Sequence, residues 1–414
     1  MNKTKKLIIS LILIVVIALI VGFIFLYFHK KDKIIPTEEE LKPTEYKSVK
    51  LENASEIVNY GSCTSTNPDE VCYLVINESM LTLKNGKVTK EDGDTTNVDD
   101  SINNGLNSAI LGTYGTYTKI EETSINTNAD GASGVFINGT KAEGELLNTV
   151  INTLKTNSPG VVVANNGFLK ADHLTITTKV KTSPAVRVTK SNGTIEIEKS
   201  MLETNGNASP IVDAEGKVTI TETTGTANGS RIASIKNNGN VTINNSSMLI
   251  SGATDSEHSE SAVLFTSDKK DSKNIFQSIN SSLNINQNLP YYNIAYIFVA
   301  DNSTTEIDLE NTLFNYGSNK FLKGTNSNIT INLKNQIIYG LIELENSNLQ
   351  MNLIENSSYT GTFIDNNTFV YLSKDSELNL TGDMYIKELN NDDKSNSNIT
   401  LNGYHLYVNN ELVK

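Results

Sequence analysis

The 414-residue sequence contains no Trp, and aromatic residues make up only 7% of it. A compact enzyme with a large aromatic core is a poor match for this composition, and a repetitive β architecture suits it better. Arg is almost absent as well, because Arg187 and Arg231 are the only two copies, and the net charge is −13. Such a surface does not attract polyanions, so we expect no nucleic-acid partner.

Cysteine is equally scarce. Cys63 and Cys72 are the only two, and they lie nine positions apart in a polar segment. This spacing is typical of a local disulfide formed in an oxidising compartment. Two unrelated free thiols are the alternative interpretation.

Long apolar stretches are missing except at the N-terminus, where residues 7–28 carry no charge and have lysines on both sides. As a helix this run spans about 33 Å, enough to cross a bilayer. A cleaved signal peptide is the rival interpretation, but its apolar core is shorter and ends at a small-residue cleavage site. We therefore expect an uncleaved signal anchor.

The flanking lysines nearly balance and do not set the direction of this anchor. The predicted disulfide favours a C-terminal part outside the cytoplasm. We expect a cytoplasmic tip at residues 1–6, a transmembrane signal anchor at 7–28, a solvated linker at 29–48 and an extracellular domain at 49–414. The protein would then be a single-pass protein of the cell membrane.

Asn, in contrast, is abundant at about one residue in eight, and it tolerates the positive φ angles of tight turns. A short pattern also recurs. It consists of two apolar residues with one residue between them, then a polar turn, and then a third apolar residue. Clear copies begin at Leu81, Leu169, Ile195, Val241, Ile307 and Ile399, and weaker copies at Thr118, Gly144, Val218, Leu283, Ile329, Leu349 and Leu378. Most copies are 20 to 26 residues apart, the repeat length of a solenoid.

Several copies are preceded by another apolar segment. These segments are GVFI at 134, GVVV at 160, AVRV at 185, PIVD at 210, RIAS at 231 and YIFV at 296. Alternation with period two and Asn-Gly turns favour strands over helical repeats. Three strands per turn is the arrangement of a right-handed β-helix. We therefore predict an all-β fold, a right-handed single-stranded parallel β-helix of about thirteen coils, roughly 60 Å long.

Two steps between copies are too long for the period, Leu81 to Thr118 and Val241 to Leu283. Insertions on a solenoid tend to lie on its functional face, so the loop from about Thr266 to Ser282 is a candidate ligand-binding loop. The copy at Val218 lacks a clear third apolar residue, which predicts a local irregularity.

Seven segments carry a resemblance to a known family. They are GLNSAIL at 105, DGASGVFINGT at 130, ASPIVDAEG at 208, FVADNSTTEIDLENT at 298, QIIYGLIELENSNLQMNLIENSSYTG at 336, SELNLTGDMYIKEL at 376 and NITLNGYHLYV at 398. Together they resemble adhesin-like right-handed β-helix surface proteins of the pectate-lyase-like superfamily, over residues 81–408. The resemblance implies a rod at the cell surface, and the family has no settled biochemical role.

Enzymes of this superfamily set a test for catalysis. Their lyases use a basic residue, commonly Arg, beside calcium held by carboxylates, and inverting hydrolases need two opposed carboxylates. Arg187 alternates with valines and is expected to point outward into solvent, and neither its coil nor that of Arg231 offers a carboxylate cluster. We expect no catalytic residue, no cofactor and no enzymatic activity, with a polysaccharide lyase or hydrolase as the alternative.

Two weaker site hypotheses concern a metal and a ligand face. Glu91 and the candidates Asp92, Asp94, Asp99 and Asp100 crowd ten residues of the first long step, and this set could bind Ca²⁺ or be a plain acidic loop. Without Trp, a carbohydrate-binding face must use Tyr, and the candidates are Tyr291, Tyr292 and Tyr296. Packing in the core or at an edge is the alternative for these tyrosines.

Three functions therefore stand at this point. The first is a membrane-anchored adhesin-like protein that binds a polysaccharide or surface glycan through a β-helix face. The second is the lyase or hydrolase, and the third is a structural envelope protein without a ligand.

Overall fold

The computed structural model describes residues 49–190, 192–251, 261–286, 295–316, 320–364 and 367–413, all of which belong to the unit Thr44–Lys414. The expected anchor at 7–28 and linker at 29–48 lie outside the described residues. Within these ranges, the structure contains no helix that is both long enough and apolar enough to span a bilayer.

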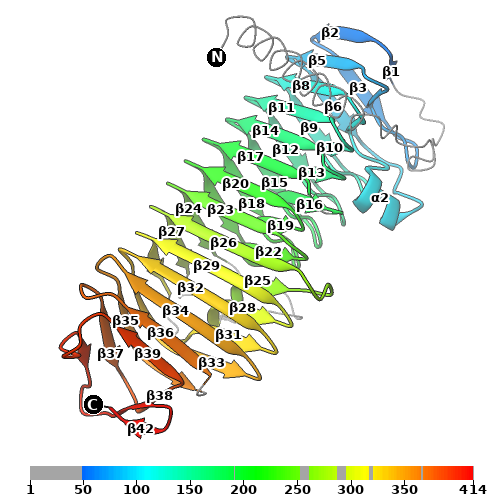
Figure 1. Ribbon diagram of the computed structural model, residues 1–414. Coiled ribbons are helices and arrows are strands. Elements are labelled where there is room, and N and C mark those ends of the chain that lie inside the picture. Colours follow the sequence, from blue (N-terminus) through cyan, green and yellow to red (C-terminus); the bar gives the residue numbers. More distant parts are fainter. Residues whose placement is uncertain are drawn as a thin grey trace, which may run out of the picture. The chain divides into compact units, whose positions relative to one another are not determined.

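Parallel strands of the described chain form three sheets, which we call A, B and C (Figure 1). Sheet A contains fifteen strands in the order β1 (Val49–Glu52), β4 (Tyr73–Ile76), β7 (Ile110–Thr113), β10 (Val135–Asn138), β13 (Val161–Ala164), β16 (Val186–Thr189), β19 (Val212–Ala214), β22 (Ala233–Lys236), β25 (Ser261–Thr266), β28 (Tyr296–Asp301), β31 (Lys320–Thr325), β33 (Ile337–Glu345), β35 (Ser358–Ile364), β37 (Glu377–Leu380) and β40 (Ile399–Thr400).

The other sheets follow the same stacking. Sheet B contains fourteen described strands in the order β2 (Ser55–Asn59), β5 (Met80–Lys84), β8 (Tyr117–Glu121), β11 (Glu143–Leu147), β14 (Phe168–Asp172), β17 (Thr194–Glu198), β20 (Lys217–Thr221), β23 (Asn240–Asn244), β26 (Lys273–Ile279), β29 (Thr304–Glu310), β32 (Asn328–Lys334), β34 (Asn348–Ile354), β36 (Thr368–Leu372) and β39 (Glu388–Asn391). Sheet C contains ten, in the order β3 (Ser62–Ser65), β6 (Lys87–Lys90), β9 (Ser124–Thr127), β12 (Val150–Thr153), β15 (Thr175–Thr178), β18 (Met201–Thr204), β21 (Thr224–Ala227), β24 (Ser247–Ile250), β27 (Ser282–Ile285) and β30 (Leu313–Asn315). A small sheet D joins β38 (Met384–Ile386), β41 (Leu406–Val408) and β42 (Glu411–Leu412).

As far as β30, one strand from each sheet makes one coil, and the chain then returns to sheet A one step along the axis (Figure 1). The predicted parallel β-solenoid is confirmed, with about fourteen coils where the sequence suggested about thirteen. Its first coil, β1 to β3, precedes the first recognised copy of the repeat, since Leu81 lies in β5 of the second coil. Sheet C ends at β30 among the described strands.

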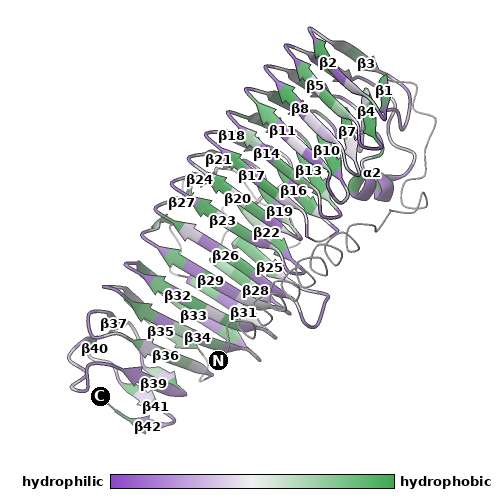
Figure 2. Cartoon of the chain, turned by 45° about the horizontal axis from the view of Figure 1, so that its top comes forward, coloured by the Kyte–Doolittle hydropathy of each residue, from purple (hydrophilic) through white to green (hydrophobic). Residues whose placement is uncertain are grey.

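Alternation along each strand builds the core. In β14, Leu169 and Ala171 are fully buried whereas Lys170 between them is exposed, and the third apolar residue of that copy, Ile176 in β15, is fully buried as well. Figure 2 shows the same alternation of hydrophobic and hydrophilic residues along the strands. Each coil buries its apolar side chains against the coils on either side, so stability comes from stacking rather than from any single coil.

The turns from sheet B to sheet C use Asn at several of their corners. Most of them contain one residue in the left-handed region, such as Asn245, Asn280 and Asn311, with φ of 47°, 48° and 47°. Asn adopts this region at lower cost than most other residues with a side chain. A buried Ser or Thr follows, and its hydroxyl accepts a hydrogen bond from the preceding coil: the amide of Thr223 donates to Oγ of Ser246 at 3.0 Å.

The register of the strands shows that the prediction of a copy of the repeat beginning at Leu283 is wrong. This residue pairs with Met248 in sheet C and occupies the third position of its coil, not the first. Phe276 occupies the first position, opposite Val241 in sheet B. The error arose because Ser278, two residues after Phe276, occupies the second position of the repeat and hides the apolar pattern of that strand.

The same register corrects the second long step. The stretch from Thr266 to Ser282 contains the regular strand β26, paired with β23 and β29, so it is not an inserted loop. At the C-terminal end, Leu378 and Ile399 pair with each other in sheet A rather than in sheet B.

The coil at Val218 keeps its register with both neighbouring coils. Its irregularity is only the absence of an apolar side chain at the third inward position, where Gly225 lies between Leu202 and Met248 of the neighbouring coils. A Cβ added at Gly225 would lie 2.5 Å from Sδ of Met248, so this neighbour fills the space.

The first long step is an inserted segment that carries the helix α2 (Val98–Asn104), beside sheet A in Figure 1. The helix ends at Gly105, which has φ of 83°. Gly105 sits so close to the outer side of sheet A that an added Cβ would lie 2.7 Å from Leu111 and 2.8 Å from Phe136. Both belong to a second apolar cluster, separate from the core, and the inserted segment covers this cluster.

Candidate functional site

A groove of about 530 Å³ crosses four successive coils at the corner between sheets B and C. The turns β20–β21, β23–β24, β26–β27 and β29–β30 form it. Its lining residues are Glu222, Thr223, Thr224, Asn245, Ser246, Ser247, Asn280, Ser281, Ser282, Asn311 and Leu313. The coil that contains Gly225 is therefore the first coil of the groove.

The backbone beneath the groove is held by buried hydroxyl groups. The amide of Thr223 donates to Oγ of Ser246, and the amide of Ser246 donates to Oγ of Ser281 at 3.1 Å. Each hydroxyl also donates to a carbonyl of its own turn, at 2.6 Å for Ser246 to Asn244. Because the buried polar groups of these turns are satisfied from coil to coil, the corner presents its outer side chains in a fixed array.

Amides and hydroxyls dominate the exposed surface of the groove. Nδ2 of Asn311 donates to Oδ1 of Asn280 at 2.9 Å, and Oγ of Ser282 donates to Oγ of Ser247 at 3.0 Å. An amide side chain has two donor hydrogens and two acceptor lone pairs, so each retains capacity for a ligand. At one end the groove reaches the apolar side chain of Leu313, which is 66% exposed.

Of the residues that line the groove, Glu222 is the only one with a carboxyl group. General acid and base catalysis of glycoside cleavage needs two positioned carboxyl groups, and this lining supplies one. The arrangement can therefore orient a polyhydroxylated ligand through hydrogen bonds, but the lining holds no catalytic pair.

The expectation that Arg187 is solvated is wrong. Arg187 points outward from β16 but is only 9% exposed, and its Nε donates to Oδ2 of Asp213 on the next coil at 2.9 Å. Burial raises the pKa of the Asp213 carboxyl, but Lys236 and Arg187 outweigh this effect and hold the pKa below its usual value. The register across coils, which brings residues 26 positions apart together, creates this pair.

Arg231 is also buried, at 3% exposure, and its Nη1 donates to Oγ of Ser261 at 3.1 Å.

Two of the candidate acidic residues in the inserted segment, Asp94 and Asp100, have structural partners. Asp100 accepts hydrogen bonds from Asn97 at 2.7 Å and Asn104 at 2.8 Å, which ties both ends of α2 together. Asp94 accepts the amide of Asp130 at 2.8 Å. Asp92 and Asp99 lie in the same segment, Asp99 in the first turn of α2. Throughout the described ranges, the structure brings no three His, Cys, Asp or Glu side chains together in a way that could hold a metal ion.

Of the three tyrosine candidates, only Tyr296 lies in the described residues. Tyr296 is only 3% exposed, its hydroxyl donates to Glu343, and Nζ of Lys320 lies 4.9 Å from the centre of its ring. Its ring is therefore committed to packing. Tyr291 and Tyr292 lie outside the described residues.

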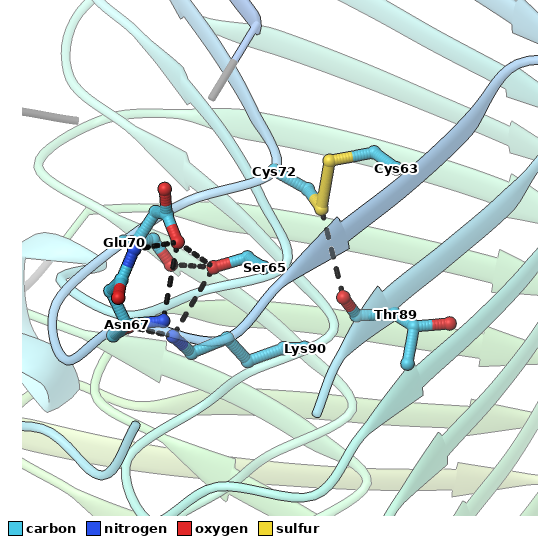
Figure 3. Close-up of a disulfide and its surroundings, with 7 residues drawn as sticks. All are labelled: Cys63, Ser65, Asn67, Glu70, Cys72, Thr89 and Lys90. Atoms are coloured by element: carbon cyan, nitrogen blue, oxygen red, sulfur yellow. Dashed lines mark hydrogen bonds between the residues drawn. A yellow bond between two sulfur atoms is a disulfide. The ribbon is translucent and has the colours of Figure 1, made fainter. Parts of the chain in front are cut away.

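Cys63 and Cys72 form a disulfide in the structure, with Cα atoms 5.8 Å apart (Figure 3). Cys63 lies in β3, and Cys72 lies immediately before β4. The bond closes the short loop that connects sheet C to sheet A near the N-terminal end of the solenoid.

Sequence reasoning missed a buried lysine beside this disulfide. Lys90 of β6 is completely buried, and its Nζ donates to Oγ of Ser65 at 3.3 Å and to the main-chain oxygen of Asn67 (Figure 3). Burial lowers the pKa of Lys90 to about 8, although the nearby carboxylates of Glu70 and Asp69 act in the opposite direction.

The groove was missed as well, although the sequence carries a signal for it. The pairs Asn245-Ser246, Asn280-Ser281 and Asn311-Thr312 each mark one of its corners. Their separations of 35 and 31 residues obscure the repeat, because longer connections intervene.

The fold and the groove define the class of this protein as a three-sheet parallel β-solenoid with a polar groove along one corner. Comparison with known proteins adds no family, since no family model and no curated protein matches the chain.

Proposed function

We propose that the protein is an adhesin-like, non-enzymatic cell-surface protein that binds a glycan through the groove between sheets B and C. The observation that carries this proposal is the array of amide and hydroxyl side chains that line the groove, with Asn at three of its four corners and Glu222 at the other. Sugar hydroxyls both donate and accept hydrogen bonds, and so do Asn side-chain amides and Ser hydroxyls. A fixed array of such groups orients a sugar without reorganising on binding.

The proposal includes the membrane placement. Residues 7–28 anchor the chain, and the solenoid lies outside the cell as a right-handed β-helix of the pectate-lyase-like type. The disulfide Cys63–Cys72 supports an oxidising compartment. The pairing of Arg187 with Asp213 supports a role in packing rather than in proton abstraction.

A glycan array probed with the full chain in detergent micelles tests the proposal. Ser282→Trp fills the groove, and Ser124→Trp is its matched control, because Ser124 holds the same position in β9, away from the groove. Both serines accept a hydrogen bond at 3.2 Å from the Asn two residues later. We expect Ser282→Trp to weaken binding by about tenfold or more, about 1.4 kcal/mol, and the control to change it little.

Two results would count against the proposal. One is that the unmodified protein binds no glycan on the array. The other is that both tryptophan variants lose binding equally, which would place the contact outside the groove.

A further inference from the structure

The outer face of sheet C adjoins the groove, and in the groove coils it carries no charge. The first and third residues of β21, β24, β27 and the three-residue β30 point outward, and all are Thr, Ser, Asn or Leu. The groove and this face together form one continuous surface, on which the carboxyl group of Glu222 is the only ionisable side chain.

The outer face of sheet B in the same coils differs sharply. Strand β29 presents Glu306, Asp308 and Glu310 outward, and β26 presents Lys273, which forms an ion pair with Glu306. In these coils, charged side chains are therefore absent from the outer face of sheet C and present on the outer face of sheet B, in β20, β26 and β29. An acidic sugar placed on the neutral side would lose hydration without meeting a cation, and the acidic chain would repel it.

The groove also repeats along the axis. Asn245, Asn280 and Asn311 occupy equivalent corners with φ within one degree of each other. Neighbouring strands lie about 4.8 Å apart, so the groove extends over roughly 15 Å across its four coils, and the three equivalent Asn corners span roughly 10 Å of it. A linear polymer that lies parallel to the axis meets an Asn side chain at three successive coils and a hydroxyl at Thr224, Ser247 and Ser282, whereas a branched or compact ligand cannot follow this row.

We infer that the ligand of the groove is an uncharged, linear glycan chain that lies along the solenoid axis, with one end against Leu313. The inference rests on the glycan-binding function proposed above and names the chemical class of its ligand. The exposed Leu313 side chain matches the apolar face of a sugar ring, and the hydroxyls and amides of the preceding coils match its polar edges.

The test uses the full chain in detergent micelles and titration calorimetry. The probes are cello-, malto- and manno-oligosaccharides of increasing length, with oligogalacturonates and sulfated oligosaccharides as charged counterparts. We expect a neutral series to bind, its affinity to rise with length up to about the four-coil span and then level off, and added salt to change the affinity less than about twofold.

Asn284→Lys places a cation on the neutral face, and Asn126→Lys is the control, because Asn126 makes the same hydrogen bond in β9. We expect Asn284→Lys to weaken binding of the neutral series by about tenfold and the control to stay within about twofold. Binding confined to charged glycans, or binding that Asn284→Lys strengthens, overturns the neutral class but leaves the glycan-binding function standing. Absence of binding to every glycan overturns both.

Discussion

Replacing Ser246 by Ala tests whether buried hydroxyls hold the corner between sheets B and C. Oγ of Ser246 accepts the amide of Thr223 at 3.0 Å and donates to the carbonyl of Asn244 at 2.6 Å, and the side chain is 6% exposed. The variant leaves both main-chain groups without these partners in a buried turn. A buried unsatisfied polar group costs about 1–3 kcal/mol, and we expect Ser246→Ala to lower the free energy of unfolding by that amount.

The neighbouring serine provides the control. Ser247 is exposed, and we expect Ser247→Ala to change the free energy of unfolding by less than about 0.5 kcal/mol. Urea unfolding of the full chain in detergent micelles measures both values, and hydrogen exchange at the amide of Thr223 measures the local effect. If Ser246→Ala were as stable as Ser247→Ala, with unchanged exchange at Thr223, the hydroxyl ladder would not stabilise the corner.

Two further predictions concern buried charges. Asp213→Asn leaves the Arg187 guanidinium buried without its counter-ion, so we expect a loss of about 3–5 kcal/mol at pH 7 in urea unfolding. Because the pKa of Asp213 is lowered in the fold, this difference should shrink as the pH falls below about 4, and a constant difference would contradict the pairing. The pKa of Lys90 is about 8 in the fold, below its usual 10.5. Between pH 8 and pH 10.5 the unfolded chain therefore binds more protons than the folded chain, so the free energy of unfolding should rise with pH over this range. We expect Lys90→Met to remove that rise, which is on the order of 3 kcal/mol, and an identical pH profile for the variant would refute the assignment.

The sequence allowed the interior to be predicted because a strand has only two faces. Leu169 and Ala171 in β14 and Ile176 in β15 needed only the alternation of apolar residues to be assigned to the core, and all are buried. Stacking of parallel strands followed from the repeat length. Reliance on this alternation also caused the wrong assignment at Leu283, because one Ser in an inward position removes the apolar signal of a whole strand.

Contacts between coils could not be predicted, because they depend on register to a single residue. Arg187 and Asp213 meet only because β16 and β19 align them, and a shift by one residue would turn each toward the core. Tyr296 and Glu343 lie 47 residues apart, and no local pattern links them. The groove required the positions of four turns, and each turn alone looks like an ordinary Asn-containing turn.

At the corner between sheets B and C, three consecutive residues divide two roles between them: one stabilises the fold and the others face the groove. In the turn at Asn280, the left-handed Asn points its amide outward, Ser281 is buried and caps the preceding coil, and Ser282 begins the next strand at the groove surface. A change at the buried serine acts on the fold, whereas a change at its outer neighbours acts on the ligand. Because this unit recurs at Asn245 and Asn280, its outer side chains can change from coil to coil while the buried serines keep the same contacts between coils.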